Sequence, residues 1–519
     1  MNEGLLPFGP GAWVFIALYL CSLLLVGWWG YRARREDSMK DFYLAGGGFG
    51  FIVLVLTLYA TQYSGNTLFA FTGKTYRIGY AWTMSVHFMT AVIVFYLLLA
   101  PKLQARARSR GFITPADYLH DRFSYAPLSV LASVVMIVAL ANYLLAQLMA
   151  MGRAVEGLSA NTEVDVYLWA VIALALIMVI YETLGGLRAV AWTDVLQGVV
   201  LMLGFVILTV LVFVYFGGPE TSALKILAQE GGGEKLQPPG WAMSREWFSY
   251  IFMVGIGAAL YPQAIQRLYA ARSPAVLRRS LQVMAFLPLT ASLIAVFIGI
   301  TALANFPGLK EVEADRVLTV VFRDIQAQGS VGYWLVVVLF SAVLAAIMST
   351  ADSALLSISS MFSGDLYRRA SPGASEKSLT LVGKLSSWAL IVILVFLAVA
   401  LRGTTLLKLL DRKFDLLVQL SPAFFIGLHW SGLRSRPVFA GLVAGLVISL
   451  GLALGVGGKP WGIHAGLYGL PVNLAIAVGG SLHGSLEAVL SCLPFTVRMS
   501  AQRFLPPIDS NCPLSFAES

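Results

Sequence analysis

SAVLAAIMSTADSALLSISSMFSGDL, residues 341–366, combines the length of a membrane span with a polar centre. Ser349, Thr350 and Asp352 lie in the middle of an otherwise apolar helical stretch. Hydroxyl and carboxylate groups at that depth of a membrane need a partner other than lipid. We therefore expect this helix to face the interior of a helical bundle and to bind a monovalent cation there.

The composition of the whole chain is that of a polytopic membrane protein. Of its 519 residues, 58% are hydrophobic and only 12% are charged, which is far from the balance of a soluble domain. Apolar segments of about 20 residues, long enough to cross a bilayer, predict an all-α protein with about thirteen spans. The expected spans are 12–31, 50–72, 80–100, 128–150, 166–184, 190–216, 246–266, 281–304, 331–360, 383–401, 414–431, 437–456 and 467–490.

The distribution of Lys and Arg predicts how the spans are oriented. When the N-terminus is placed outside, most basic residues, Arg188 and Arg267 among them, fall in cytoplasmic segments, as the positive-inside rule requires. The formal net charge of +9 then follows from topology and predicts no nucleic-acid partner. We expect a bacterial inner membrane protein, in the plasma membrane, with its C-terminus in the cytoplasm. The exception is the external loop expected before residue 414, which holds Arg402, Lys408, Arg412 and Lys413.

Two spans carry residues that break a helix in the middle of the membrane. They lie five helices apart and in opposite predicted orientations, which is the inverted-repeat pattern of a transporter binding site. The alternative for the first span is an unbroken helix whose hydroxyl groups bond to their own backbone. The first span contains Thr61, Gln62, Ser64, Gly65, Asn66 and Thr67, and the second contains Gly255, Gly257 and Pro262.

Isolated polar residues in other spans have two interpretations each. Asn142, Tyr143 and Gln147 share one helical face, and they either line a cavity or join neighbouring helices by hydrogen bonds. Asp194 lies about one turn into its span, where it is either a solvated N-terminal acid or part of an ion path.

The histidines and the 3 cysteines are scattered singly, so the sequence predicts no enzyme.

Five segments of the chain form a recognisable set of motifs. They are DFYLAGG at 41–47, GFITPADYLHDRF at 111–123, YETLGGLRAVAWTDVLQG at 181–198, QRLYAARS at 266–273, and AAIMSTADSALL at 345–356 followed by GDLY. Together they resemble the sodium:solute symporter family, which includes bacterial proline, pantothenate and sugar symporters. The resemblance covers about residues 30–430.

This resemblance implies a LeuT-type core of two inverted five-helix repeats. The expected divisions are a peripheral first span at 1–36, a core at 42–432 with repeats at about 42–220 and 245–432, two additional spans at 433–490 and a short cytoplasmic tail at 491–519.

The resemblance also implies a sodium ion between the first broken span and the helix at 331–360. Asp194 matches a family aspartate on the ion path. Carbonyl and hydroxyl oxygens are suitable ligands for a hard cation. The implied sodium ligands are the carbonyl oxygens of Ala60, Tyr63 and Ala346 and the hydroxyl groups of Ser349 and Thr350.

We expect the solute beside that ion, at the midplane between the two broken helices. The candidate ligands are polar and uncharged, which favours a neutral, zwitterionic or small carboxylate solute, such as an amino acid, a carboxylate or a vitamin-like compound. These candidates are Gln62, Asn66, Thr67, Tyr143, Gln147, Tyr261 and Gln263.

Three positions depart from the family pattern. Many relatives carry an arginine after the Ala-Gly pair of the FYLAG stretch, where this chain continues with Gly47 and Gly48, and Gln62 stands where proline symporters carry an aspartate. Asp352 is unusual, and it either makes proton coupling available or hydrogen-bonds within the bundle.

We predict a secondary-active symporter that couples sodium influx to uptake of a small organic solute by alternating access. Its partners would be the solute and membrane lipid, with no obligate protein partner. The alternatives are a proton-coupled transporter of the same fold, with Asp352 and Asp194 as its titrating groups, and a solute-sensing membrane protein.

Overall fold

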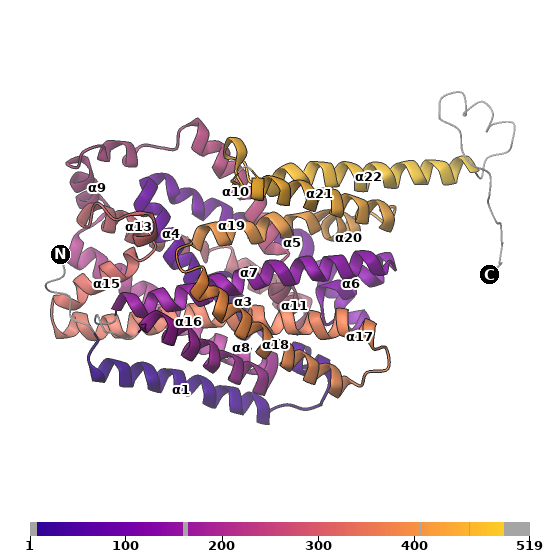
Figure 1. Ribbon diagram of the computed structural model, residues 1–519, viewed down its shortest axis with the longest axis horizontal. Coiled ribbons are helices and arrows are strands. Elements are labelled where there is room, and N and C mark those ends of the chain that lie inside the picture. The colour runs from indigo at the N-terminus through magenta and orange to yellow at the C-terminus, as the bar shows by residue number, and fades with distance from the viewer. Residues whose placement is uncertain (1–7, 159–164, 405, 456, 492–519) are drawn as a thin grey trace.

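Long helices make up most of the structure and lie roughly parallel to one another (Figure 1). The computed structural model describes residues 8–158, 165–404, 406–455 and 457–491, and the regular elements in these ranges are helices. Short helices lie at the two ends of the bundle, with α9 and α15 at one end and α6 and α17 at the other (Figure 1).

The helices have the following bounds: α1 Pro10–Arg32, α2 Met39–Leu44, α3 Phe51–Gln62, α4 Gly65–Ile78, α5 Met84–Arg110, α6 Pro115–Phe123, α7 Ala126–Leu158, α8 Val166–Phe216, α9 Pro219–Leu227, α10 Trp241–Ala259, α11 Pro262–Ala270, α12 Pro274–Met284, α13 Pro288–Asn305, α14 Glu311–Ala314, α15 Val317–Ala327, α16 Ser330–Met361, α17 Arg368–Ala370, α18 Glu376–Ala400, α19 Leu406–Leu417, α20 Gly427–His429, α21 Ser435–Gly455 and α22 Ala465–Ser491.

Among the described residues, 9 helices are long and apolar enough to cross a membrane, or 10 when the bent pair of α10 and α11 counts as one span. The helix α8 alone covers two of the expected spans, 166–184 and 190–216. It is divided at Gly186, whose backbone angles of φ 60° and ψ −151° are accessible to glycine alone. A Cβ atom at Gly186 would also lie 2.4 Å from the carbonyl oxygen of Phe42. The count of about thirteen spans stays a prediction.

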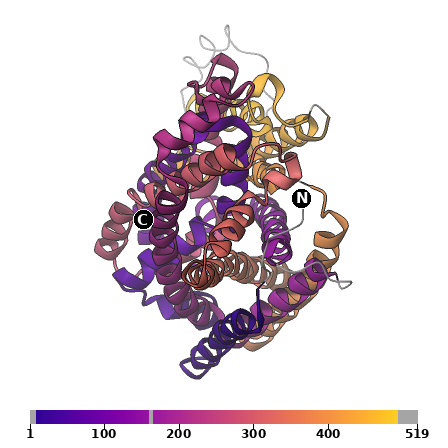
Figure 2. The ribbon, with the colours of Figure 1, turned by 90° about the vertical axis from the view of Figure 1, so that its left-hand side faces the viewer.

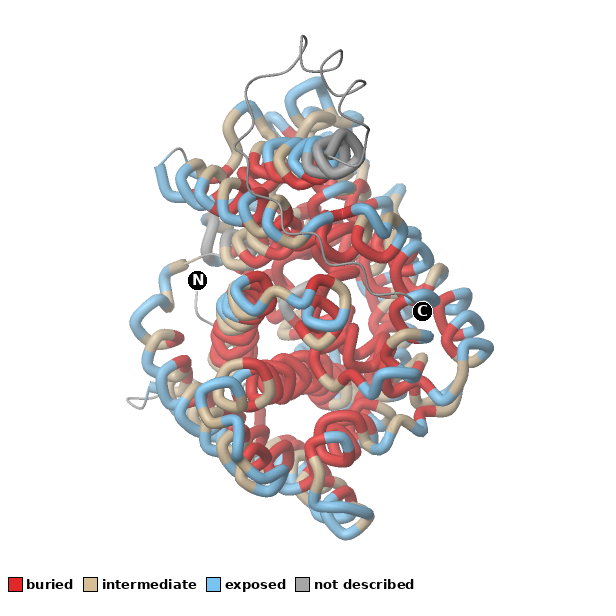
Figure 3. The backbone as a smooth tube through the Cα atoms, turned by 90° about the vertical axis from the view of Figure 1, so that its right-hand side faces the viewer, coloured by how far each residue is buried: buried red, intermediate tan, exposed pale blue. Residues whose placement is uncertain are grey.

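The helix α16 forms the centre of the bundle, and α1 lies at its rim. In the most apolar stretch of α16, 72% of the residues are buried, whereas the corresponding value for α1 is 22%. The view along the bundle axis shows the helices end-on (Figure 2), and the buried segments gather in the middle with exposed segments around them (Figure 3). The polar residues of α16 therefore face other helices and not lipid.

Polar contacts join the helices at both ends of the bundle. At the end predicted to face the cytoplasm, the backbone of Phe49 before α3 pairs with the end of α11 and the residues that follow it. Its N–H donates to Ala270 and its carbonyl accepts from Arg272, both at 2.9 Å. At the other end, Lys459 between α21 and α22 lies 2.9 Å from Glu246 of α10 and 2.8 Å from Asp411 of α19.

Candidate functional site

Both predicted helix breaks are confirmed. In the first broken span, α3 ends at Gln62 and α4 begins at Gly65, with Tyr63 between them at φ −104° and ψ 89°. In the second, α10 ends at Ala259 and α11 begins at Pro262 after a bend of 50°. Proline fits the first position of a helix, where its missing N–H is not needed, so Pro262 starts the second half. The alternative of an unbroken first span is wrong.

Three of the expected sodium ligands meet where α3 faces α16. The hydroxyl group of Thr350 lies 3.0 Å from the carbonyl oxygen of Ala60 and 3.1 Å from that of Ala346, as a donor shared between the two. This single group connects the end of the first half-helix to the centre of α16. Tyr63 follows Ala60 at the break and is buried.

Ser349, another expected ligand, points to Asp194. Its hydroxyl group donates a hydrogen bond to Oδ1 of this carboxylate, and Oδ2 accepts from Thr57 of α3. All three side chains are buried. The alternative that Asp194 is a solvated N-terminal acid is therefore wrong, because its carboxylate lies inside the bundle beside the expected sodium ligands.

Arg267 also belongs to this site, so the prediction that it lies in a cytoplasmic loop is wrong. It belongs to α11, is 0% exposed and lies 2.8 Å from Oδ2 of Asp194. It also donates to the hydroxyl group of Thr57 at 2.6 Å. The positive-inside rule assumes that an arginine is solvated by water. Here the ion pair with Asp194 takes the place of that hydration. The motif QRLYAARS contains Arg267, but no local signal pairs it with a residue 73 positions away.

Asp352 hydrogen-bonds within the bundle. The hydroxyl group of Tyr181 in α8 donates to its Oδ2 at 2.6 Å, and Ser353 donates to its Oδ1 at 3.3 Å. In the described part of the chain no Lys, Arg or His forms an ion pair with Asp352. The carboxyl group is 0% exposed, and the two side chains that donate to it, Tyr181 and Ser353, do so through hydroxyl groups.

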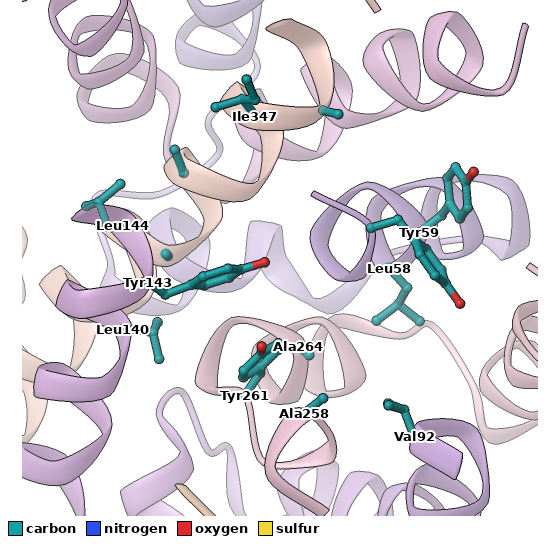
Figure 4. Packing of buried hydrophobic residues seen from close by; sticks show 14 of the residues in the cluster. Leu58, Tyr59, Val92, Leu140, Tyr143, Leu144, Ala258, Tyr261, Ala264 and Ile347 are labelled. Carbon is teal, nitrogen blue, oxygen red and sulfur yellow. The ribbon is translucent and has the colours of Figure 1, made fainter. Parts of the chain in front are cut away.

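Three of the expected solute ligands, Gln62, Tyr143 and Tyr261, line one cavity between the broken helices. The rings of Tyr143 and Tyr261 stack with their centroids 5.5 Å apart, and both side chains reach into the same region (Figure 4). The cavity has a volume of about 20 Å³, which is room for about one water molecule. The other lining residues are Phe71, Phe88, Met89, Val254, Ala258, Lys413 and Phe414.

Two further candidates, Gln147 and Gln263, are buried but are not among the residues that line this cavity. Their amide groups have no hydrogen-bond partner within the described ranges, which is costly for a buried polar group. Asn142 instead joins two helices, because its amide donates to the carbonyl oxygen of Leu409 in α19 at 2.6 Å.

The last two candidates, Asn66 and Thr67, belong to α4. Their side chains lie outside the part of the chain that the structure describes in atomic detail.

The prediction that Lys413 lies in an external loop is also wrong. The expected external loop is partly the helix α19, in which Lys413 is 1% exposed and lines the cavity. Counting charges between apolar segments treats each lysine as solvated, and the sequence DRKFD carries no signal that this one is enclosed.

Solved structures of similar fold include membrane transporters. A sodium-coupled sialic acid symporter in a substrate-bound outward-open state matches with a TM-score of 0.75 and 18% identity, over 91% of this chain and 98% of that one. The nucleobase-cation-symport-1 transporter Mhp1 matches with a TM-score of 0.55 and 14% identity, over 88% and 97% of the two chains. The fold is therefore of the LeuT type, a membrane fold with a cavity between two broken helices.

The chain belongs to the sodium:solute symporter family, whose model matches residues 42–445. By sequence it is 25% identical to sodium/proline symporter 2 of Staphylococcus saprophyticus over 446 residues, which are 83% of this chain and 84% of that protein. It is also 25% identical to an uncharacterized symporter of Bacillus subtilis over 429 residues, which are 81% and 85% of the two. The protein is therefore a multi-pass, sodium-coupled solute symporter, and its family and these relatives are transporters and not enzymes.

Proposed function

We propose that this symporter binds its coupling sodium ion between α3 and α16 and its solute in the adjoining cavity. The observation that carries the proposal is the hydroxyl group of Thr350, which connects the carbonyl oxygens of Ala60 and Ala346. The sodium ligands would be oxygens of Ala60, Tyr63, Ala346, Ser349 and Thr350, with Asp194 on the ion path. The solute ligands would be Gln62, Asn66, Thr67, Tyr143, Gln147, Tyr261 and Gln263.

Transport follows alternating access between two conformations. Sodium joins the first broken helix to α16 and favours the outward-open state, and solute binding then completes the site. The cavity volume of about 20 Å³ leaves no room for an organic solute, which supports a closed conformation. The solute therefore enters only when the rings of Tyr143 and Tyr261 separate. With the N-terminus outside and the C-terminus in the cytoplasm of a bacterium, inward sodium flow drives uptake across the plasma membrane.

The test is a thermal-unfolding screen of the purified protein against small amino acids, carboxylates, sugars and vitamins, each in sodium and in potassium. A ligand that binds the native state raises the unfolding temperature by mass action. We expect at least one solute to stabilise the protein in sodium only. A solute that stabilises equally in potassium would contradict the proposed sodium site.

A proton-coupled transporter is the second candidate, and Asp352 favours it. This buried carboxyl group accepts from Tyr181 at 2.6 Å and has no ion-pair partner among the described residues. A carboxyl group without a cation is able to bind a proton or a second cation. Uptake in sodium-free buffer under an imposed pH gradient distinguishes this function from sodium coupling.

A further inference from the structure

A lysine that forms no ion pair with any described residue lies in the wall of the cavity. Lys413 is 1% exposed, and its Nζ atom lies over the face of Tyr143, 3.0 Å from the ring centroid. The ring centroids of Tyr261 and Phe414 lie 4.8 Å and 4.9 Å from the same Nζ atom. All three aromatic residues also line the cavity, so the amino group lies where we expect the solute.

The amino group of Lys413 has no hydrogen-bond partner within the described ranges. Two acidic residues lie two positions from Lys413 along the helix. The carboxylate of Asp411 is 2.8 Å from Lys459 and accepts from Tyr250, and the carboxylate of Asp415 accepts from the backbone N–H of Gly466 at 2.7 Å. A buried ammonium group needs a counter-ion and acceptors for three hydrogen atoms. Aromatic faces attract a cation but accept no full hydrogen bond. An anionic ligand would therefore supply what this lysine lacks.

The remaining wall of the cavity indicates what the rest of the ligand is like. The other polar residues that line it are Gln62, Tyr143 and Tyr261, and none of its lining residues is acidic. Gln62 already donates to the hydroxyl group of Tyr96. All the other lining residues are apolar or aromatic. Such a wall fits one anionic group attached to a small, largely apolar body, and it offers no carboxylate to an amino group of the ligand.

We propose that Lys413 binds the carboxylate of the transported solute and that the solutes are small monocarboxylates. This inference rests on the proposed function of the cavity as the solute site. Planar carboxylate oxygens accept charge-assisted hydrogen bonds from an ammonium group, and the aromatic rings around Lys413 pack against the apolar body. The cavity is narrow, so the bound state requires Tyr143 and Tyr261 to move apart around a ligand of a few carbon atoms.

The test compares acids with their amides. Unfolding temperatures of the purified protein are measured in sodium and in potassium with acetate, propionate, lactate and pyruvate, and with propionamide and lactamide. Proline and galactose complete the panel. We expect at least one monocarboxylate to stabilise the wild-type protein in sodium, with an affinity about ten- to a hundred-fold above that of its amide. Stabilisation by an amide as strong as that by its acid would overturn the role of Lys413.

Three variants locate the effect. Lys413→Gln removes the charge, and we expect carboxylate binding about ten- to a hundred-fold weaker. Its unfolding temperature without solute should stay close to that of the wild type, because no hydrogen bond is lost. Lys413→Arg keeps the charge and should retain part of the affinity. Arg412→Gln removes a neighbouring charge of α19 that does not line the cavity, and it should bind as the wild type does.

The outcomes separate this inference from the function on which it rests. Unchanged carboxylate affinity in Lys413→Gln, or sodium-dependent binding of proline or galactose with no monocarboxylate binding, overturns the lysine's role and leaves the sodium-coupled solute site intact. Monocarboxylate binding that is lost in Lys413→Gln but is equal in sodium and potassium supports the lysine and contradicts the sodium site.

Discussion

The guanidinium group of Arg267 lies 2.8 Å from Oδ2 of Asp194, and both side chains are almost fully buried, with exposures of 1% and 0%. This ion pair joins α11, the second half of a broken helix, to α8. Ser349 of α16 donates to the other oxygen of the same carboxylate. The pair therefore connects the second broken helix, beside the proposed solute site, to the helix that carries proposed sodium ligands.

Asp194→Asn should destabilise the protein, because it leaves the guanidinium group of Arg267 buried without a counter-ion. We expect a loss of about 3 to 5 kcal/mol in unfolding free energy. The double variant Asp194→Asn with Arg267→Met removes both charges and should recover much of that stability. Uptake should stay about ten-fold or more below wild type in both, since Ser349 loses a charged acceptor worth about 1.5 to 3 kcal/mol. Thermal unfolding and uptake into proteoliposomes measure the two effects, and equal instability of the single and double variants would contradict the pairing.

Thr350→Ala should raise the sodium concentration needed for half-maximal uptake. The substitution removes the group that connects Ala60 to Ala346, and loss of one such ligand costs about 1.5 to 3 kcal/mol, or about ten-fold or more in affinity. Ser349→Ala should act in the same direction. Thr350→Ser keeps the hydroxyl group and is the matched control. Wild-type sodium dependence in both alanine variants would rule out the proposed sodium site.

Asp352→Asn distinguishes sodium coupling from proton coupling. The hydroxyl group of Tyr181, 2.6 Å from the carboxylate, is able to donate to the amide oxygen instead, so the fold should be retained. For a sodium-driven symporter we expect uptake within about three-fold of wild type, a change of less than 1 kcal/mol. Uptake by the wild type under a pH gradient in sodium-free buffer, abolished in Asp352→Asn, would establish the proton-coupled alternative.

The sequence predicts the parts of this site that have local signals. A cluster of glycine, proline and polar residues at the centre of an apolar span indicates a helix break, so the sequences around Gly65 and Pro262 predict the two breaks from their own segments. The contact between Thr350 and Ala60 spans 290 positions, and the expectation that the two residues meet came from the family resemblance alone. Local pattern thus predicts the breaks, and resemblance supplies the partners across them.

Lys413 and Arg267 were not predictable, because charge counting assumes that a basic residue at the end of a span lies in water. This assumption fails for both residues because of contacts that form only in the folded protein. Arg267 is enclosed because Asp194 neutralises it. Lys413 is enclosed by the aromatic rings of Tyr143, Tyr261 and Phe414. Neither Asp194 nor those rings are close to these residues in sequence, apart from Phe414.

Gly65→Ala should disturb the contact between the first helix break and α16. A Cβ atom on Gly65 would lie 1.8 Å from Cγ1 of Ile347, which follows the proposed ligand Ala346. Forcing extra volume into a packed site costs about 1 to 3 kcal/mol or more. The double variant with Ile347→Ala removes the clash, so it should be more stable than the sum of the two single effects predicts. The unfolding temperatures of the wild type, the two single variants and the double variant are compared in a double-mutant cycle. Strictly additive effects of the two substitutions would mean that the two residues do not meet.

Lys459→Met should destabilise the end of the bundle that is predicted to face outside, because Lys459 lies 2.8 Å from Asp411 and 2.9 Å from Glu246. We expect a loss of about 2 kcal/mol, read as a lower unfolding temperature. Lys225→Met is the control, because Lys225 has an exposed contact with Asn305 and should change stability by less than about 0.5 kcal/mol.

The difference between wild type and Lys459→Met should also stay constant between about pH 6 and 9. Burial alone would lower the pKa of Lys459, but Asp411, Tyr250 and Glu246 raise it well above its ordinary value of 10.5. A raised pKa in the folded state means that the stabilisation is complete below the unfolded pKa and is lost only as the pH rises through the folded one. Burial lowers the pKa of the neighbouring His464 well below its ordinary value, so this imidazole stays neutral across the same range. A difference in unfolding temperature that disappears between pH 6 and 9 would show that Lys459 is not held by these carboxylates.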